Sequence, residues 1–276
     1  MKDFSITKYA HLLSSFCEEG YSFLLFSDYC RMSCGENTGR FIVLRHDVDE
    51  LATNALIMAQ VEQQMGIHAT YFFRRVRQSD NPEVIKEIVK LGHEVGYHYE
   101  DLATAEGNME VAVASFERNL AYFRQYYPVK TVCMHGSSSS VYDNRDIWKI
   151  KTLSDFGLIG EPYLTVDFDK VFYLTDTGYA WDGGKFAVRD VVENKFGLSF
   201  HTTDQIIECV KNGDFPSQSM ILAHTLWTDS QMQWWKLHVR EYVRNRVKYA
   251  TKHSRLLASM YRVLVKSYWK NSRRDE

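Results

Sequence analysis

Short apolar runs alternate along this chain with longer segments whose apolar residues recur at helical spacing. The most marked run is Phe41-Ile42-Val43-Leu44, which continues directly into Arg45-His46-Asp47-Val48-Asp49. An uninterrupted apolar run of this kind is typical of a strand that is covered on both faces. Further strands are expected at 69–73, 93–98, 129–134 and 220–223.

Amphipathic helical segments separate these strands, and this alternation favours a parallel sheet. At 276 residues, a single closed (β/α) barrel fits the length. The chain has 45% apolar residues and 4 prolines, so it can bury a large core. We therefore expect an α/β fold with one main domain over residues 1–228.

The last part of the chain, residues 229–276, differs from the rest in pattern and charge. It has helical periodicity, and from Lys236 onwards it holds 12 Lys/Arg against 3 Asp/Glu, whereas residues 1–235 hold 21 against 32. We expect a basic helical extension packed on the barrel with a solvated basic face. The other interpretation is a helix that makes peripheral contact with an anionic membrane surface or a partner.

Three further features bear on location and partners. The N-terminus has no apolar signal-peptide core, and no apolar run approaches the ~20 residues of a membrane span. The five cysteines are scattered, without zinc-knuckle spacing, so a reducing cytoplasm is expected. Apart from the basic tail, nothing favours nucleic-acid binding.

Ionisable side chains stand where the predicted strands end. They are Asp47, Asp49, His98, His135 and His224. The carboxyl ends of parallel strands meet at one edge, and imidazoles with carboxylates suit zinc, or cobalt, nickel or iron. Such a site can activate water, while a carboxylate takes a proton and a histidine gives one. The pattern therefore predicts metal-dependent hydrolysis of an amide or ester, and the alternative is an Arg-His-Asp network that only caps a strand.

Four segments in this order resemble the polysaccharide deacetylase family, carbohydrate esterase family 4. They are Arg45-His46-Asp47-Val48-Asp49, Gly92-His93-Glu94-Val95-Gly96-Tyr97-His98, Met134-His135-Gly136 and Leu222-Ala223-His224. The resemblance implies a distorted (β/α) barrel of about seven parallel strands, followed here by the long C-terminal helical extension. It also implies an Asp-His-His-bound divalent metal, most simply zinc. By this resemblance Asp47 is the general base, Asp49 and His98 are metal ligands, and His224 is the acid.

The motifs depart from the family pattern at several positions. Val48 separates the two aspartates, so the roles of base and ligand could be exchanged. The family has a histidine four residues after His98, where this chain has Leu102. The missing ligand could come from His135, His46, Glu100 or Asp101, and we favour His135 because it ends a neighbouring strand. The third motif lacks its usual Arg and Pro before the Gly.

The predicted substrate is an acetylated sugar or related glycan. We expect it to contact Arg45, Tyr97, Trp181 and Trp227, because aromatic side chains stack on sugar faces. The alternative function is a catalytically inactive deacetylase-like barrel that binds a glycan or a partner. A third hypothesis is another metallohydrolase barrel, such as an amidohydrolase that acts on a small molecule.

Overall fold

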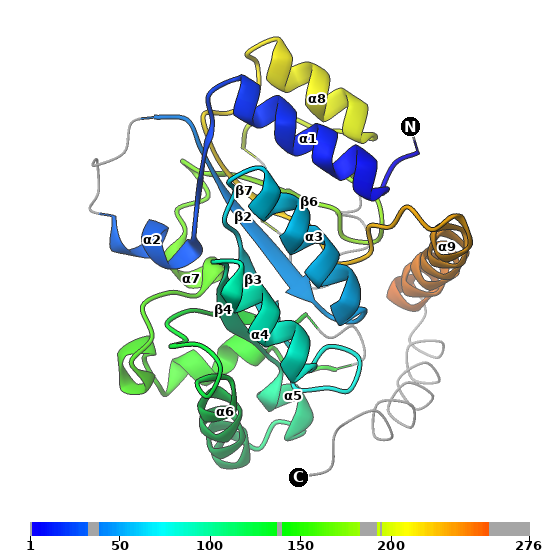
Figure 1. Cartoon of the computed structure of the whole chain (residues 1–276). Coiled ribbons are helices and arrows are strands. Elements are labelled where there is room, and N and C mark those ends of the chain that lie inside the picture. Colours follow the sequence, from blue (N-terminus) through cyan, green and yellow to red (C-terminus); the bar gives the residue numbers. More distant parts are fainter. Residues whose placement is uncertain (1, 33–38, 137–139, 183–191, 194, 254–276) are drawn as a thin grey trace.

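A parallel sheet forms the centre of the protein. The computed structural model describes residues 2–32, 39–136, 140–182, 192–193 and 195–253 (Figure 1). The strands are β1 (Ser22–Leu24), β2 (Phe41–Val48), β3 (Thr70–Phe73), β4 (Glu94–Tyr99), β5 (Val132–Met134), β6 (Phe172–Thr175) and β7 (Gln218–Leu222). Six of them follow the order β5-β4-β3-β2-β7-β6, β1 pairs with β2 outside this order, and every pairing is parallel. The predicted α/β fold, a distorted barrel of parallel strands, is confirmed.

Helices cover the outside of this sheet. They are α1 (Ile6–Glu18), α2 (Phe26–Arg31), α3 (Ala52–Gln64), α4 (Pro82–Lys90), α5 (Asp101–Thr104), α6 (Met109–Phe123), α7 (Pro162–Thr165), α8 (Thr203–Lys211) and α9 (Gln231–His253), with 3₁₀ helices at Asn144–Lys149 and Leu153–Phe156. In Figure 1, α1, α3, α4 and α8 lie along one side of the strands, and α2 lies at the other end of the sheet from α5. In α/β folds of this kind the functional site lies at the carboxyl ends of the strands.

The central strand β2 has two buried faces with different surroundings. Phe41 and Val43 belong to an inner apolar cluster that also contains Phe72 and Met220. Side chains alternate along a strand, so the next residue on this inner face is Arg45. The other face of β2 packs under the helices. Because of this alternation, Arg45 and Asp47 point into the barrel, on the same face of β2 as the apolar residues Phe41 and Val43.

One close approach in the sheet gives a stability prediction. Gly96 of β4 pairs with Phe72 of β3, and a Cβ at this glycine would lie 2.4 Å from the Phe72 ring and 2.9 Å from the Thr131 carbonyl oxygen. Gly96→Ala is expected to lower the free energy of unfolding by about 1–3 kcal/mol, because the backbone of β5 cannot yield without disturbing the sheet. Urea unfolding measures this change, and a value equal to that of the wild type would contradict the close packing.

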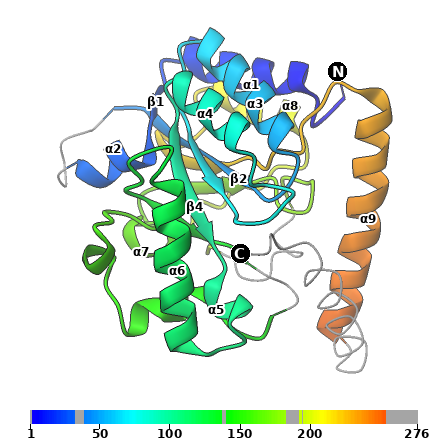
Figure 2. The ribbon, with the colours of Figure 1, turned by 60° about the horizontal axis from the view of Figure 1, so that its bottom comes forward.

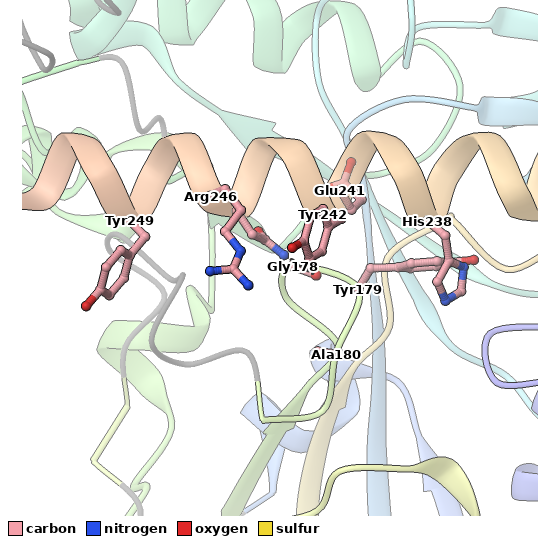
Figure 3. A pocket seen from close by; sticks show the side chains of 9 residues that line it. Gly178, Tyr179, Ala180, His238, Glu241, Tyr242, Arg246 and Tyr249 are labelled. Carbon is pink, nitrogen blue, oxygen red and sulfur yellow. Dashed lines mark hydrogen bonds between the residues drawn. The ribbon is translucent and has the colours of Figure 1, made fainter.

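The C-terminal helix α9 stands at the side of the barrel (Figure 2). Trp234 Nε1 donates to the Asp3 carbonyl oxygen at 2.7 Å, and Arg240 Nη1 bonds Glu50 Oε2 at 2.8 Å. The turn that contains Gly178 lies against the same helix (Figure 3). The predicted helix is therefore present up to His253, and the rest of the predicted extension lies outside the described residues.

Among the described residues, no helix combines the length and the apolar composition that a membrane span needs. The division into two units at residue 228 stays a prediction.

Candidate active site

The carboxyl ends of the strands bring the predicted side chains to one edge of the sheet. Asp47 and Asp49 lie at the end of β2, and His98 lies near the end of β4. His135 follows β5 and His224 follows β7. All of these strands run in the same direction, so their last residues meet at this edge. The structure thus brings together the five side chains that the strand-end pattern selected.

Three of these side chains have the geometry of a metal site. Asp49 Oδ1 lies 3.5 Å from His98 Nε2 and 3.5 Å from His135 Nε2. Ligands at about 2 Å from one tetrahedral zinc ion are about 3.3 Å apart, so these separations fit a shared ion. Asp49 Oδ1 is also buried and has no hydrogen-bond partner among the residues that the structure describes. The predicted ligand set Asp49, His98 and His135 therefore fits a divalent metal.

In both His98 and His135, the Nδ1 atom lies within hydrogen-bond distance of an oxygen acceptor. His98 Nδ1 donates to the Cys133 carbonyl oxygen at 2.9 Å, and His135 Nδ1 lies 2.9 Å from Glu100 Oε2. Arg74 Nη2 in turn donates to both oxygens of Glu100 at 2.8 Å. Hydrogen bonds of this kind place the proton on Nδ1 and leave the Nε2 lone pair for a metal. Burial alone would raise the pKa of Glu100, but Arg74 and His135 hold it below its usual range.

The three other side chains proposed as the missing ligand point elsewhere. His46 lies on the opposite face of β2, where Nε2 is 2.9 Å from Glu62 Oε1. Asp101 accepts a hydrogen bond from the Tyr97 hydroxyl at 2.8 Å. Glu100 is occupied by its arginine and histidine partners. Among the candidates weighed from the sequence, the structure groups only His135 with the other two ligands.

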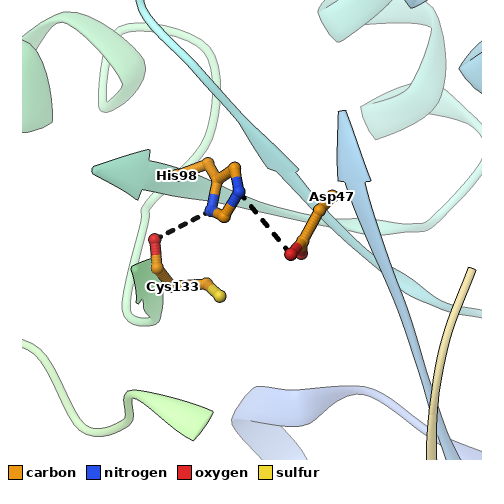
Figure 4. Close-up of side chains that lie close together, drawn as sticks. All are labelled: Asp47, His98 and Cys133. Carbon is orange, nitrogen blue, oxygen red and sulfur yellow. Dashed lines mark hydrogen bonds and ion pairs between the residues drawn. The ribbon is translucent and has the colours of Figure 1, made fainter. Parts of the chain in front are cut away.

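A second group of potential ligands shares one of these histidines (Figure 4). His98 Nε2 is also 3.5 Å from Asp47 Oδ2, and the Cys133 sulfur lies within 4.8 Å of a ligand atom of each of these two residues. However, the Cys133 thiol belongs to the apolar inner cluster and donates to the Met134 carbonyl oxygen at 3.6 Å. The Asp49 group is the better fit for a metal, because its carboxylate oxygen is not yet used.

Asp47 is bound by an arginine two residues earlier on the same strand face. Arg45 Nε donates to Asp47 Oδ1 at 2.9 Å and Arg45 Nη2 to Asp47 Oδ2 at 2.8 Å. Both side chains are buried, and Arg45 Nη2 also contacts the Tyr163 hydroxyl at 3.1 Å. Burial alone would raise the pKa of Asp47, but the Arg45 and His98 charges hold it well below its usual range. The carboxylate is therefore ionised and fixed in orientation, and Arg45 positions it instead of facing a substrate.

His224 has an aspartate partner that the sequence analysis did not select. His224 Nδ1 lies 2.7 Å from Asp176 Oδ1, and Trp227 Nε1 donates to Asp176 Oδ2 at 2.9 Å. Burial would lower the pKa of His224, but the hydrogen bond and charge of Asp176 outweigh it and raise the pKa to about 9. His224 is therefore protonated at neutral pH, as an acid requires.

The three aromatic residues predicted to contact a sugar lie inside the protein. Tyr97 binds Asp101 beneath α6, the Trp181 Nε1 atom donates to Thr203 Oγ1 at 2.9 Å, and Trp227 is fully buried. The prediction of sugar-stacking faces at these positions is corrected, because the rings are enclosed by the apolar core. Tyr97 could have been placed from its pattern, since it neighbours His98 on β4 and so points to the other face.

Arg74 and Asp176 were missed as functional candidates, Glu100 was considered only as a metal ligand, and all three follow strands. Arg74 comes directly after β3, Glu100 after β4 and Asp176 after β6. The same strand-end pattern that selected the histidines applies to them. It does not reveal which of the charged residues at one edge pair with each other, because that depends on the relative positions of neighbouring strands.

Comparisons with known proteins give similar solved structures. No protein-family model matches the chain, and the search of curated proteins finds no significant match. The catalytic domain of peptidoglycan N-acetylglucosamine deacetylase from Eubacterium rectale is 15% identical, with 79% of this chain and 91% of that chain covered and a TM-score of 0.46. The family 4 carbohydrate esterase from Streptomyces lividans is also 15% identical, with coverages of 75% and 90% and a TM-score of 0.40. BA3943 from Bacillus anthracis, described as a family 4 pseudoenzyme, is 15% identical, with coverages of 74% and 62% and a TM-score of 0.39. The Streptomyces lividans and Bacillus anthracis proteins are carbohydrate esterase family 4 proteins, and this is the family that the motifs of this chain resemble.

Proposed function

We propose that this protein is a metal-dependent hydrolase that removes an acetyl group from an N-acetylated sugar. The observation that supports this most is the buried Asp49 Oδ1 atom, which accepts no hydrogen bond in the described chain and faces the Nε2 atoms of His98 and His135. Beside it stand an ionised carboxylate and a protonated histidine, which are the two groups that amide hydrolysis needs.

The residues have distinct parts in this reaction. Asp49, His98 and His135 would hold a divalent metal, most simply zinc, which when bound polarises a carbonyl and makes water more acidic. Asp47, kept ionised by Arg45, accepts the proton of the attacking water. His224, kept protonated by its aspartate, donates a proton to the leaving amine of the sugar.

Metal content and acetate release test this proposal. Elemental analysis is expected to find about one zinc or other transition metal per chain in the wild type. His98→Ala and His135→Ala should each lose most of it, since each removes one of the ligands. The metal-loaded wild type should release acetate from N-acetylglucosamine or its disaccharide. Absence of metal under every loading condition would exclude the proposed mechanism and favour the inactive, glycan-binding barrel.

Asp176→Asn is expected to shift the pH dependence of deacetylation. Without the negative charge, the pKa of His224 falls from about 9 towards its ordinary value of 6.5. His224 then loses its proton at a lower pH. The alkaline limb of the kcat/KM profile should therefore shift to lower pH by about one to two pH units. The pH profile of kcat/KM measures this, with Asp146→Asn, at a partly exposed site, as the control. An unmoved alkaline limb would show that His224 is not the acid.

We also propose a cytoplasmic location with peripheral contact between α9 and an anionic membrane surface. Large apolar side chains are exposed along the outer face of this helix, namely Met232, Trp235, Val239 and Val243. Basic residues flank them, which is the composition of interfacial helices. Sedimentation with phosphatidylserine vesicles should recover the wild type and lose a Trp235→Ser, Val239→Ser double variant. Equal recovery of both proteins would contradict this contact.

A further inference from the structure

A cavity of about 450 Å³ lies between α9 and the turn that follows β6 (Figure 3). Its size lies within the range of small-ligand sites. The turn contributes Gly178, Tyr179 and Ala180, and in the figure Arg246 and Tyr249 extend from the helix towards the side where this turn lies. The cavity is separate from the metal ligands and has no part in the reaction proposed above.

Two buried polar atoms in the wall of this cavity have no hydrogen-bond partner within the described chain, namely Tyr179 Oη and Asn245 Oδ1. Tyr179 and Asn245 are only 7% and 8% exposed. The Asn245 Nδ2 atom donates to the Gly178 carbonyl oxygen at 2.7 Å, which fixes the amide and leaves its oxygen as the free acceptor. Buried polar atoms are nearly always paired, so two unpaired atoms around one cavity indicate a polar ligand.

The backbone of the turn is strained at Tyr179. Tyr179 has φ +61°, in the left-handed region that a non-glycine residue seldom adopts. Its ring stacks on Phe4 at 4.4 Å and meets His238 edge-on at 4.6 Å. The packing therefore holds an unfavourable backbone conformation and places a phenol group at the cavity, which is typical of functional positions.

The lining suits a sugar ring better than a charged or purely apolar ligand. Tyr242 and Tyr249 contribute aromatic rings to the lining, and aromatic rings pack against the apolar faces of sugars. The phenol of Tyr179 and the amide oxygen of Asn245, which have no hydrogen-bond partner in the described chain, match sugar hydroxyls, which both donate and accept hydrogen bonds. Arg246, whose guanidinium lies 5.1 Å from the Tyr242 ring centroid, adds a further donor at the outer end.

The cavity is built on the same turn that holds the predicted acid. Tyr179 N donates to the Asp176 carbonyl oxygen at 2.9 Å, and the Asp176 carboxylate binds His224. We propose that the cavity binds a second sugar unit of the glycan whose acetyl group is removed at the metal site. The identity of this sugar as part of the substrate rests on the proposed function, whereas its binding to the cavity does not.

Calorimetric titration with N-acetylglucosamine and with N,N′-diacetylchitobiose tests this site. Both sugars are titrated into EDTA-treated and into zinc-loaded protein. The disaccharide is expected to bind about tenfold more tightly than the monosaccharide, because a ligand that occupies both sites gains the contacts of each. Tyr179→Phe removes one hydroxyl and should weaken binding of either sugar at the cavity by about three- to tenfold. Val243→Ala, on the exposed face of α9, is the control and should change neither affinity.

The outcomes separate this inference from the proposed function. Disaccharide binding that Tyr179→Phe weakens, in protein that releases no acetate, would support the cavity as a sugar site and reject the hydrolase. Acetate release with equal affinities for the two sugars, or a disaccharide affinity that Tyr179→Phe leaves unchanged, would overturn the sugar site. Absence of binding by either sugar would overturn it as well and would leave a cavity filled by water.

Discussion

Asp47→Asn is expected to lower the rate of acetyl hydrolysis by about 10²- to 10⁴-fold while the protein keeps its metal. Both oxygens of Asp47 accept hydrogen bonds from Arg45, so this carboxylate is kept ionised and is oriented. An amide at this position preserves much of the shape but cannot take a proton from water. The loss should therefore appear in kcat, with bound metal unchanged by elemental analysis.

Asp49→Asn is the matched variant for this experiment. Asp49 Oδ1 is a buried oxygen that accepts no hydrogen bond in the described chain, and it faces both histidine Nε2 atoms. Its replacement should lower metal content first and activity as a consequence, and added metal should restore part of the rate. The sequence left the roles of the two aspartates open because Val48 separates them. Loss of metal in Asp47→Asn but not in Asp49→Asn would show that the roles are exchanged.

The positions of the strands, and of the ionisable residues at their carboxyl ends, could be predicted from the sequence because a parallel α/β fold constrains both. A run such as Phe41–Leu44 must be covered on both faces, and parallel strands carry their last residues to one edge. His135 could be chosen as the third ligand on this basis alone, and the structure groups it with Asp49 and His98.

The pairing of charged groups could not be predicted, because it depends on how far neighbouring strands are shifted along each other. The contact between Glu100 and His135 joins the ends of β4 and β5, and that between Asp176 and His224 joins the ends of β6 and β7. The burial of Trp227 was missed for a similar reason. Its indole lies between Phe4 and Tyr9, which the sequence places more than two hundred residues away.

A fully buried carboxylate on the outer side of β2 is the centre of a second polar network. Glu62 of α3 accepts hydrogen bonds from the Tyr9 hydroxyl at 2.5 Å and the Tyr71 hydroxyl at 2.8 Å. His46 Nε2 lies 2.9 Å from the same carboxylate, and His93 Nδ1 lies 3.5 Å from it. All of these side chains are buried between the sheet and the helices. The network ties α1 and α3 to the strand that leads to Asp47 and Asp49.

Glu62→Ala is expected to lower the free energy of unfolding by about 3–5 kcal/mol. The substitution leaves His46 and two tyrosine hydroxyls buried without their common acceptor, and it opens space beneath α3. Tyr71→Phe is the control, because it removes one donor and keeps the charge pair, and it should lower the free energy by about 1–2 kcal/mol. Urea unfolding at neutral pH measures both. A loss in Glu62→Ala no larger than that in Tyr71→Phe would show that the ion pair adds nothing to stability.

The same carboxylate makes stability depend on acid pH, and the sign follows from its pKa. Burial alone would raise the pKa of Glu62, but the charge and hydrogen bond of His46 outweigh it and hold the pKa below the ordinary value of 4.5. The unfolded chain therefore takes up this proton first, so the stabilisation is complete above that value and is lost as the pH falls through the folded pKa. Asp47 and Glu100 act in the same direction, so the test compares slopes. Between neutral pH and about pH 4, Glu62→Gln should lose less unfolding free energy than the wild type, because it has no proton to take up at this position. Equal slopes would mean that Glu62 is not ionised in the folded protein.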